Sequence, residues 1–342
     1  MKIGIVNDSP MAVEALRRAI MQRPGCTVAW VAHDGAEAVA RCEQDPPDLL
    51  FMDMVMPGVD GVEATRRIMA ATPCPILIVT VDVGANASRV FDAMGYGALD
   101  AVNTPRMDQP QDVQSLLAKL DVIDKLIGDR QRASLTKARL DTATIWQHAP
   151  LIAIGASAGG PAALATLLSA LPGDFSASIV IVQHVDARFA EGMAHWLDEQ
   201  AALPVRAAKE GDRPMPGTVL MAATGDHLAL RDKSHLGYTP NPREYVHRPS
   251  VNVFFESVVG NWQGSAIGVL LTGMGRDGAR GLKAMRDAGH HTIAQDQASS
   301  AVFGMPKEAI AMDAAVEVLS IEQIAPRLVK LCAAPPLQRR KL

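Results

Sequence analysis

The feature that most constrains this fold is an alternation of short apolar runs with amphipathic runs, which occurs twice along the chain. In residues 1–126, each of five Val/Ile-rich runs precedes a segment with helical periodicity. The predicted strands span residues 2–6, 27–32, 49–53, 75–80 and 99–103. Because parallel strands are joined by helical crossovers, this pattern predicts an α/β fold in which five parallel strands carry helices on both faces.

A second alternation begins at residue 151 and predicts another doubly wound α/β sheet. Its predicted strands span residues 151–156, 178–183, 218–223, 266–272 and 292–295. Between the two alternations the apolar periodicity fades, and basic residues outnumber acidic ones. We therefore predict one domain at 1–122, a linker at 123–148 and a second domain at 149–342, a length sufficient for two hydrophobic cores.

Charge and composition argue against several classes of protein. A formal net charge of −4 gives no reason to expect nucleic acid or an acidic membrane as a partner. The four cysteines form no Cys-x-x-Cys pair, and no apolar run reaches the about 20 residues that span a bilayer. We expect a reduced, cytoplasmic protein with no nucleic-acid partner and no membrane insertion.

Carboxylates follow two strands of the first predicted sheet. Asp8 comes after the first strand and Asp53 ends the third. A single aspartate there is usually a helix cap or a solvated turn, but these strands are neighbours in a flavodoxin-like order, so both carboxylates meet at one edge. Paired carboxylates suit Mg²⁺, and one beside the metal can attack a phosphoryl group. Thr80 and Thr104 follow the next two strands, and the Thr80 hydroxyl can donate to phosphoryl oxygens.

A serine nucleophile is predicted in the second domain. Ser157 lies in a glycine turn between a strand and a helix, which exposes its hydroxyl. His184 follows the next strand and Asp277 follows a later one, so a base and an acid reach the same edge. His247 is the main rival for the base, whereas the pair at 290–291 is typical of a helix end. The order Ser, His, Asp disfavours a lipase-like fold.

The first domain carries motifs of a known family. They are Asn7-Asp8-Ser9, Met52-Asp53-Met54-Val55-Met56-Pro57-Gly58-Val59-Asp60-Gly61, Thr80 and Thr104-Pro105. On these residues it resembles a response-regulator receiver domain. The resemblance implies that Asp53 accepts a phosphoryl group from a histidine kinase, that Asp8 and Asp53 bind Mg²⁺, and that Thr80 and Thr104 support the phosphoryl group.

Three positions depart from the receiver pattern. The family usually has a second acid in place of Asn7, a lysine in place of Thr104 and an aromatic residue in place of Ala101. Loss of a carboxylate weakens the hold on a metal, and loss of the lysine removes a cation that pairs with the phosphoryl group. We therefore expect phosphorylation to be slower, weaker or differently coupled, with a receiver that only docks as the alternative.

The second domain carries four further motifs. They are Gly155-Ala156-Ser157-Ala158-Gly159-Gly160-Pro161, Val182-Gln183-His184, His247-Arg248-Pro249-Ser250-Val251 and Thr272-Gly273-Met274-Gly275-Arg276-Asp277-Gly278. In this order they resemble the chemotaxis protein-glutamate methylesterases, the CheB family. The resemblance implies a phosphorylation-regulated serine hydrolase that acts on methyl-accepting chemotaxis receptors. It demethylates glutamate γ-methyl esters and deamidates glutamines, and hydrolysis needs no cofactor.

The same resemblance assigns roles to individual residues. Ser157 is the nucleophile, His184 the general base and acid, and Asp277 its orienter, while the backbone amides of Ala158 and Met274 form the oxyanion hole. An ester and a primary amide both pass through a tetrahedral oxyanion and an acyl-enzyme, so one site serves both. The resemblance also implies that the unphosphorylated receiver partly covers the serine and that phosphorylation loosens this contact.

The second domain departs from its family's pattern at two positions, and the departures in the first domain resemble a subgroup. Ala158 replaces a small hydroxyl residue of the family, and Asn252 stands where an acid is common, which is expected to alter the loop that carries His247. The departures at Asn7, Thr104 and Ala101 resemble the Wsp-type variant, WspF, whose receptor serves a diguanylate cyclase cascade.

Two alternatives stay open at the level of sequence. Residues 273–278 fit G-x-G-x-x-G after a strand and before a helix, and Asp296 follows about 20 residues on, as in a dinucleotide-binding site. That reading leaves Ser157 and His184 without a role. The other alternative is a catalytically weak binding partner whose receiver controls docking to a receptor or kinase.

Overall fold

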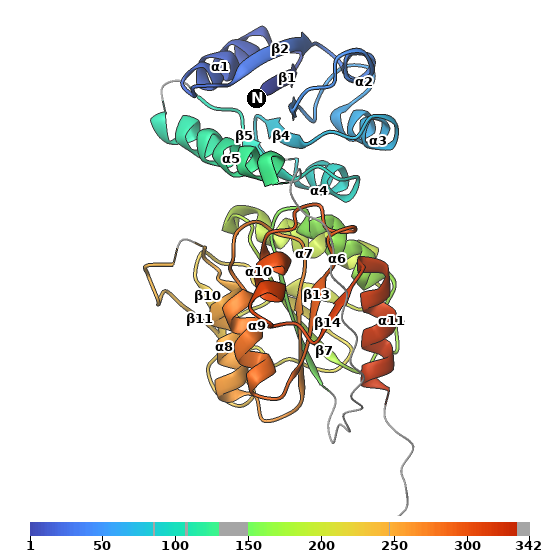
Figure 1. The fold of residues 1–342 in the computed structure, drawn as a ribbon, viewed down its shortest axis with the longest axis vertical. Coiled ribbons are helices and arrows are strands. Elements are labelled where there is room, and N and C mark those ends of the chain that lie inside the picture. Colours follow the sequence, from blue (N-terminus) through green and yellow to red (C-terminus); the bar gives the residue numbers. More distant parts are fainter. Residues whose placement is uncertain (85, 107–108, 130–149, 246, 334–342) are drawn as a thin grey trace, which may run out of the picture. The chain divides into compact units, whose positions relative to one another are not determined.

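Strands and helices alternate along the chain as the sequence predicts, and they form two parallel sheets (Figure 1). The computed structural model describes all residues except 85, 107–108, 130–149, 246 and 334–342, and it leaves the side chains at 122 and 125–129 undescribed. The chain divides into two units, Met1–Thr136 and Lys137–Leu342, which are taken separately. Most of the predicted linker and the last nine residues therefore lie outside the described part.

The first unit has the predicted flavodoxin-like sheet. Its elements are β1 (Lys2–Val6), α1 (Pro10–Met21), β2 (Thr27–Ala32), α2 (Gly35–Gln44), β3 (Leu49–Met52), α3 (Gly61–Ala71), β4 (Ile76–Thr80), α4 (Ala87–Gly95), β5 (Asp100–Asn103) and α5 (Pro110–Asp129). The strand order is β2-β1-β3-β4-β5, so β1 and β3 are neighbours as expected. Helices α1 and α5 pack together on one face, and α2, α3 and α4 on the other. The predicted domain end at residue 122 falls inside α5.

Buried strands and one glycine fix the site edge of this sheet. Every residue of β3 and β4 is buried, which matches their continuous apolar runs. Asp60 caps α3 through the amide of Glu63, and Gly61 begins the helix. A Cβ at Gly61 would lie 2.0 Å from the backbone oxygen of Asp53. Glycine therefore lets α3 start directly against the predicted phosphoacceptor.

The second unit is a larger sheet of the same kind. Its first elements are β6 (Leu151–Ala156), α6 (Gly160–Ser169), β7 (Ser178–Gln183), α7 (Ala187–Gln200), β8 (Val205–Ala207), β9 (Val219–Met221), β10 (His227–Leu230) and β11 (Leu236–Thr239). They are followed by α8 (Val251–Asn261), β12 (Ala266–Leu270), α9 (Ala279–Asp287), β13 (His291–Gln295), α10 (Met305–Ala311), β14 (Glu317–Leu319) and α11 (Ile321–Cys332). The order is β14-β13-β12-β6-β7-β9-β8, and β10 and β11 form a separate antiparallel hairpin.

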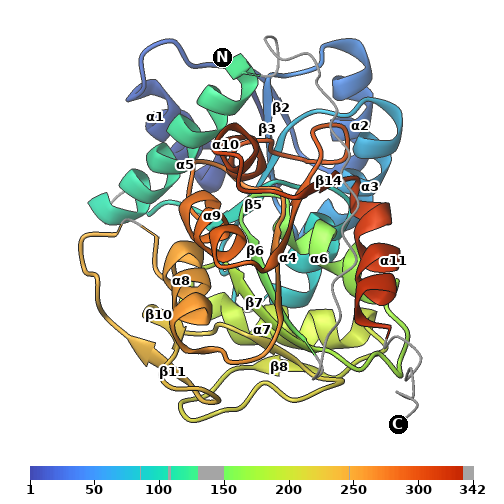
Figure 2. The same ribbon diagram turned by 60° about the horizontal axis from the view of Figure 1, so that its bottom comes forward.

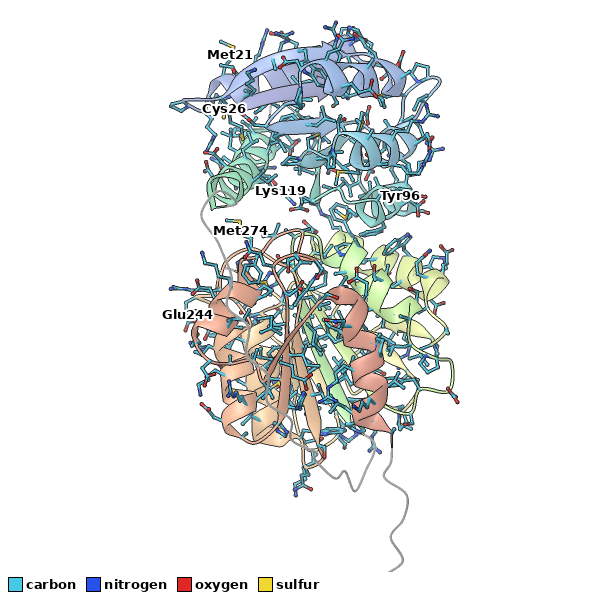
Figure 3. The ribbon with its side chains drawn as sticks, turned by 45° about the vertical axis from the view of Figure 1, so that its right-hand side comes forward. Met21, Cys26, Tyr96, Lys119, Glu244 and Met274 are labelled. Carbon is cyan, nitrogen blue, oxygen red and sulfur yellow. The ribbon has the colours of Figure 1, made fainter. Side chains whose placement is uncertain are left out.

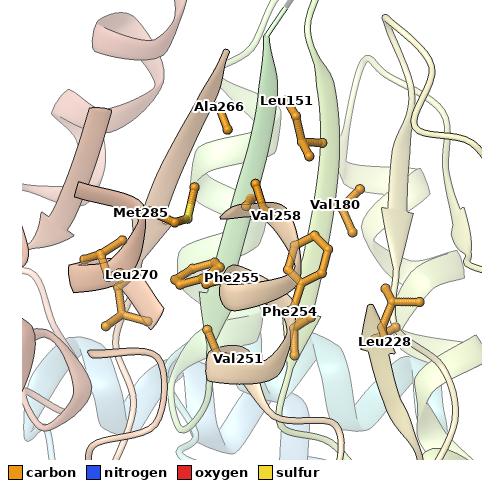
Figure 4. Close-up of a cluster of buried hydrophobic side chains, with 14 of the residues drawn as sticks. Leu151, Val180, Leu228, Val251, Phe254, Phe255, Val258, Ala266, Leu270 and Met285 are labelled. Carbon is orange, nitrogen blue, oxygen red and sulfur yellow. The ribbon is translucent and has the colours of Figure 1, made fainter. Parts of the chain in front are cut away.

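Helix α8 anchors the core on one face of this sheet. It lies beside α9 in both views (Figures 1 and 2). Its side chains Phe254, Phe255 and Val258 are fully buried among residues of β6, β7 and β12 (Figure 4). Burying a phenylalanine stabilises the fold by about 1.5–3 kcal/mol. Helices α6, α7 and α11 pack together away from α8.

Two glycines let the start of α8 approach the sheet edge. A Cβ at Gly155 in β6 would lie 2.2 Å from the Val251 side chain. Gly278 has a φ of 85°, a left-handed conformation that favours glycine, and a Cβ there would lie 2.4 Å from Leu270. The N-terminus of α8 is therefore held beside the carboxyl ends of β6 and β12, where the predicted serine and aspartate follow.

Candidate functional sites

His184 and Asp277 meet at the carboxyl edge of the second sheet. His184 follows β7 and Asp277 lies in the loop after β12, with β6 between these strands. The His184 Nε2 lies 2.8 Å from the Asp277 Oδ2. Both residues were predicted, and the structure brings them together.

The Asp277 carboxylate rests on the N-terminus of α8. Its Oδ2 also accepts the Val251 amide at 2.7 Å, and its Oδ1 accepts the Ser250 hydroxyl at 2.8 Å and the Asn252 amide at 3.2 Å. Burial alone would raise the pKa of Asp277, but the hydrogen bonds from His184, Val251 and Ser250 outweigh it and hold the pKa at about 2. The side chain is therefore an anion at neutral pH, stabilised further by the helix dipole.

This contact fixes the role of each nitrogen in the His184 ring. A carboxylate can only accept, so the neutral imidazole carries its hydrogen on Nε2 and leaves Nδ1 as a bare acceptor. The Nδ1 atom is buried, and no group in the described part of the chain bonds to it. The ring therefore has one free nitrogen that can take a proton.

Ser157 is held by its backbone, which leaves its side chain unengaged. Its amide donates to the Thr272 carbonyl at 3.0 Å, and its carbonyl accepts the Gly160 amide at 2.7 Å. Within the residues that the structure covers, the Ser157 hydroxyl makes no hydrogen bond, so the structure does not join it to His184. A Cβ at Gly273 would lie 2.8 Å from the Ser157 Cβ, so the loop that carries Asp277 also reaches the serine.

Gln183 links the serine turn to the histidine, which sequence reasoning missed. Its Nε2 donates to the Ser157 carbonyl at 2.9 Å and to the His184 carbonyl at 3.0 Å. The side chain is 3% exposed. A Cβ at Gly160 would lie 2.0 Å from the Gln183 Oε1, so glycine is required there for this side chain to fit. One buried amide thus fixes the spacing between two loops of the site.

The two amides predicted to bind an oxyanion are free to do so. In the described portion, the N–H groups of Ala158 and Met274 donate no hydrogen bond. The Gly273 carbonyl accepts the amides of Gly304 and Met305 at 3.0 and 2.8 Å. Because a trans peptide points its C=O and N–H in opposite directions, the Met274 N–H faces away from α10. Met274 lies at the surface of this unit (Figure 3).

His247, the rival base, is part of the same site. Its ring stacks on the His184 ring, with centroids 4.3 Å apart and an interplanar angle of 6°. Desolvation of the stacked ring and the neighbouring His184 lower the pKa of His247. The carboxylate, however, bonds to His184. His291 was predicted at a helix end, but it begins β13 and lies beside Glu317 instead.

Asn252 serves the site through its backbone and joins two helices through its side chain. Its amide bonds to Asp277, and its Oδ1 accepts the Gly281 amide at 2.7 Å. The side-chain oxygen thus ties α8 to α9. The departure predicted to disturb this loop therefore has a defined acceptor role.

In the first unit, Asp53 lies buried at the end of β3. Its Oδ1 accepts the Met54 amide at 2.7 Å, and its Oδ2 accepts the Asn7 Nδ2 at 3.1 Å. Burial raises the pKa of Asp53, although the Thr80 hydroxyl and the amides of Met54 and Val55 oppose the rise. Burial therefore destabilises the ionised carboxylate of Asp53.

The residues around Asp53 fit Mg²⁺ only weakly. Asp8 and Asp53 supply carboxylate oxygens, but Asn7 presents its NH₂ group to Asp53, and its oxygen accepts the Ser9 amide at 2.9 Å. No cluster of three or more His, Cys, Asp or Glu side chains suited to a metal occurs among the described residues. Thr104 donates its amide to the Thr80 carbonyl, and its buried hydroxyl has no partner in the described chain. Two carboxylates with water can still hold the ion.

Two family descriptions match the chain. Residues 152–328 match the family described as CheB methylesterase, and residues 3–115 match the response regulator receiver domain. No helix in the described residues is both long and apolar enough to cross a membrane.

Named relatives cover almost the whole chain. Protein-glutamate methylesterase/protein-glutamine glutaminase 1 of Cupriavidus pinatubonensis is 58% identical over 341 residues, 98% of this chain and 99% of that protein. Protein-glutamate methylesterase/protein-glutamine glutaminase 4 of Burkholderia thailandensis is 59% identical over 345 residues, 99% of this chain and 100% of that protein. The crystal structure of the Thermotoga maritima CheB methylesterase catalytic domain is 33% identical, with a TM-score of 0.52, and covers 54% of this chain and 98% of that one.

Proposed function

The chain belongs to the CheB methylesterase family and carries a receiver domain, and on this premise we propose that Ser157, His184 and Asp277 are its catalytic triad. The substrates that we propose are glutamate γ-methyl esters and glutamine side chains, in keeping with the relatives' names. The proteins that carry them are, on this proposal, methyl-accepting chemotaxis receptors. The observation that carries the proposal is the His184–Asp277 hydrogen bond, which leaves Nδ1 of the same ring free.

The first half-reaction forms an acyl-enzyme. The His184 Nδ1 takes the Ser157 proton as the serine oxygen attacks the glutamyl δ-carbon, and Asp277 stabilises the imidazolium through Nε2–H. The amides of Ala158 and Met274 bind the oxyanion. Collapse of the tetrahedral intermediate expels methoxide or an amide leaving group, which takes the proton from Nδ1 and departs as methanol or ammonia.

The second half-reaction restores the enzyme. Water loses a proton to the His184 Nδ1 and attacks the acyl carbon. The serine oxygen leaves and recovers that proton, which releases a glutamate side chain. No step requires a cofactor. The neutral ring of His247 covers one face of His184 and shields the transient imidazolium from water.

The receiver accepts a phosphoryl group on Asp53 from a histidine kinase and thereby regulates hydrolysis. Asp8 and Asp53 would hold Mg²⁺, which neutralises charge on the phosphoryl oxygens when bound. The hydroxyls of Thr80 and Thr104 are the hydrogen-bond donors for those oxygens. Because Asn7 contributes no negative charge, this site binds the metal more weakly than one with a third acid.

The proposal has a direct test in methanol release from methylated receptor membranes, with and without a phosphodonor. We expect release by the full chain, stimulation by the phosphodonor, and loss of several orders of magnitude for Ser157→Ala. Near-normal release by Ser157→Ala would mean that the nucleophile is misassigned. Absence of release by the unaltered chain in both states would favour the binding-partner alternative.

The dinucleotide-binding alternative has little left to support it. Asp277 lies inside the G-x-G-x-x-G segment, and its negative charge bonds to His184 rather than leaving the loop to a pyrophosphate. We expect that the purified chain, when added to NADH, neither quenches nor shifts the NADH fluorescence. We also infer a cytoplasmic location, where reducing conditions suit the unpaired thiols of Cys26, Cys42, Cys74 and Cys332.

A further inference from the structure

Arginine pairing is uneven across the second unit. Seven of its described arginines donate a side-chain hydrogen bond to an acid, a carbonyl, a hydroxyl or an imidazole. They are Arg188, Arg206, Arg213, Arg231, Arg280, Arg286 and Arg327. The guanidinium groups of the other three described arginines of this unit, Arg243, Arg248 and Arg276, make no hydrogen bond or ion pair within the described residues.

The unpaired arginines all lie on the loops of the candidate site. Arg248 directly follows His247, whose ring stacks on His184. Arg276 directly precedes Asp277 and follows Gly275, where a Cβ would meet nothing within 4 Å. Arg243 lies further from the site residues in sequence and is followed by the exposed acid Glu244, which Figure 3 labels. Arg248 and Arg276 are therefore exposed cations, without a hydrogen bond or ion pair in the described residues, directly next to His247 and Asp277 in sequence.

The acids near this pair in sequence form no ion pair with it in the described residues, and Glu244, four residues before Arg248, is exposed and makes no ion pair there. Asp277 is committed to His184 and to the start of α8. Glu256 is taken by Arg280, which also contacts the Tyr245 ring and hydroxyl. The chain as a whole carries a net charge of −4, so the positive charge of Arg248 and Arg276 beside the site is a local feature. A guanidinium that the protein leaves unpaired is suited to bind a carboxylate by two parallel hydrogen bonds.

We propose that Arg248 and Arg276 bind carboxylates of the protein substrate on either side of the glutamyl residue being hydrolysed. The partner surface is thus an acidic segment, and the two arginines select it. This inference rests on the proposed function, because it takes the Ser157 site as the place of reaction. The two cations contact flanking side chains, while the scissile ester or amide is itself neutral.

The test compares two substrates on the full chain. One is methylated receptor membranes, and the other is a small uncharged acetate ester that lacks flanking carboxylates. The quantity measured is the ratio of kcat/KM on the receptor to kcat/KM on the ester. For Arg248→Ala/Arg276→Ala at low salt we expect this ratio to fall roughly threefold to tenfold, as befits two solvent-accessible ion pairs. Added NaCl should reduce the difference in this ratio between the parent chain and the double alanine variant, because salt screens exposed charges.

Two further variants make the result specific. Arg248→Lys/Arg276→Lys keeps both charges and is expected to recover most of the ratio. Lys330→Ala removes the same kind of charge from an exposed position in the last turn of α11, and we expect it to leave the ratio unchanged. Hydrolysis of the small ester shows that the site is folded and reactive. A variant that fails to fold is recognised because it loses activity on both substrates, and the double lysine variant is then compared with the parent chain instead.

Distinct outcomes overturn the inference and the function beneath it. An unchanged ratio at low salt in the double alanine variant would overturn the role of the arginines, and so would an equal fall for Lys330→Ala. Equal loss on both substrates with an unchanged melting temperature would also overturn it, since the arginines would then act on the reaction itself. Methanol release that survives Ser157→Ala would instead overturn the proposed function.

Discussion

Asp53 and Asp277 are buried at the carboxyl edges of two similar sheets, one in each unit, and their pKa values shift in opposite directions. Asp277 has its pKa held at about 2, whereas the pKa of Asp53 is raised. Both side chains are less than a tenth exposed, so burial raises the energy of both anions. The difference lies in the donors. Asp277 receives two amides, a hydroxyl and an imidazole at the start of a helix, and Asp53 has a weaker set.

This difference matches the two proposed roles. A carboxylate that orients a histidine must stay negative and must not react, and many donors around Asp277 suit that role. A phosphoacceptor must stay nucleophilic, and a cation bound beside Asp53 would stabilise its buried charge. On this proposal, one kind of fold serves two roles through the hydrogen bonds around one side chain. Four changes test this comparison.

The largest expected effect comes from neutralising the orienting acid. Asp277→Asn should lower kcat for methanol release by about 10⁴-fold, because an amide can favour the wrong imidazole tautomer and cannot stabilise the imidazolium. Asp53→Asn is the matched change in the first unit and should leave unphosphorylated activity near that of the parent while it abolishes the response to a phosphodonor. Comparable basal losses in both variants would contradict the assignment.

Gln183→Met should have the next largest effect. It keeps the size of the side chain but removes the two hydrogen bonds that set Ser157 against His184, so we expect kcat to fall roughly 10- to 100-fold. Thr292→Val is the control, because Thr292 is also buried but its hydroxyl donates to the Ala314 carbonyl, which takes no part in the site. Both variants should lower the unfolding free energy measured in urea. If Thr292→Val lowered kcat as much, Gln183 would have no special positioning role.

Acid stability should separate the two aspartates. For Asp277 the folded pKa is depressed, so its contribution of about 2 kcal/mol is present above pH ~4 and is lost as pH falls toward 2. For Asp53 the folded pKa is raised, so its charge destabilises the fold at neutral pH and this penalty disappears as pH falls. At pH 7, Asp277→Asn should lower the unfolding free energy and Asp53→Asn should raise it. Denaturant unfolding curves at several pH values measure both changes. If the two substitutions changed the unfolding free energy at pH 7 with the same sign, the contrast between the two aspartates would be wrong.

The smallest effect is expected from restoring an acid in the first unit. Asn7→Asp replaces the NH₂ group that faces Asp53 with an oxygen, and should strengthen Mg²⁺ binding about tenfold, or 1.4 kcal/mol. Calorimetric titration with MgCl₂ measures it, and Asn86→Asp, at the start of α4, adds the same charge as a control. Unchanged affinity in Asn7→Asp would mean that Asn7 does not limit the metal site.

The sequence predicted those parts that depend on local pattern. Continuous apolar runs such as 49–52 and 151–156 marked buried strands, and the residues that follow them were predicted to meet at one edge. That reasoning brought His184 and Asp277 together correctly. The triad with Ser157 stays a prediction, as do the domain bounds, the oxyanion amides and the Wsp-type subgroup.

Other features depend on contacts that no local pattern carries. The three-residue strands β8 and β14 are too short for a clear period, and the hairpin of β10 and β11 went unpredicted. Ser250 as the cap of α8 had a signal, a serine before an apolar helical run, that could have been used. Gln183 had none, because its partners are carbonyls of loops that only the folded sheet brings together. The acidity of Asp277 likewise depends on which helix begins beside it.

In the proposed mechanism, Asp277 fixes the His184 tautomer and leaves Nδ1 for the serine proton. Imidazole ¹⁵N NMR at neutral pH tests it most directly, with the His184 signals identified by their loss in His184→Gln. We expect a protonated Nε2 and an unprotonated Nδ1 in the full chain. A proton on Nδ1, with Nε2 bare, would contradict it.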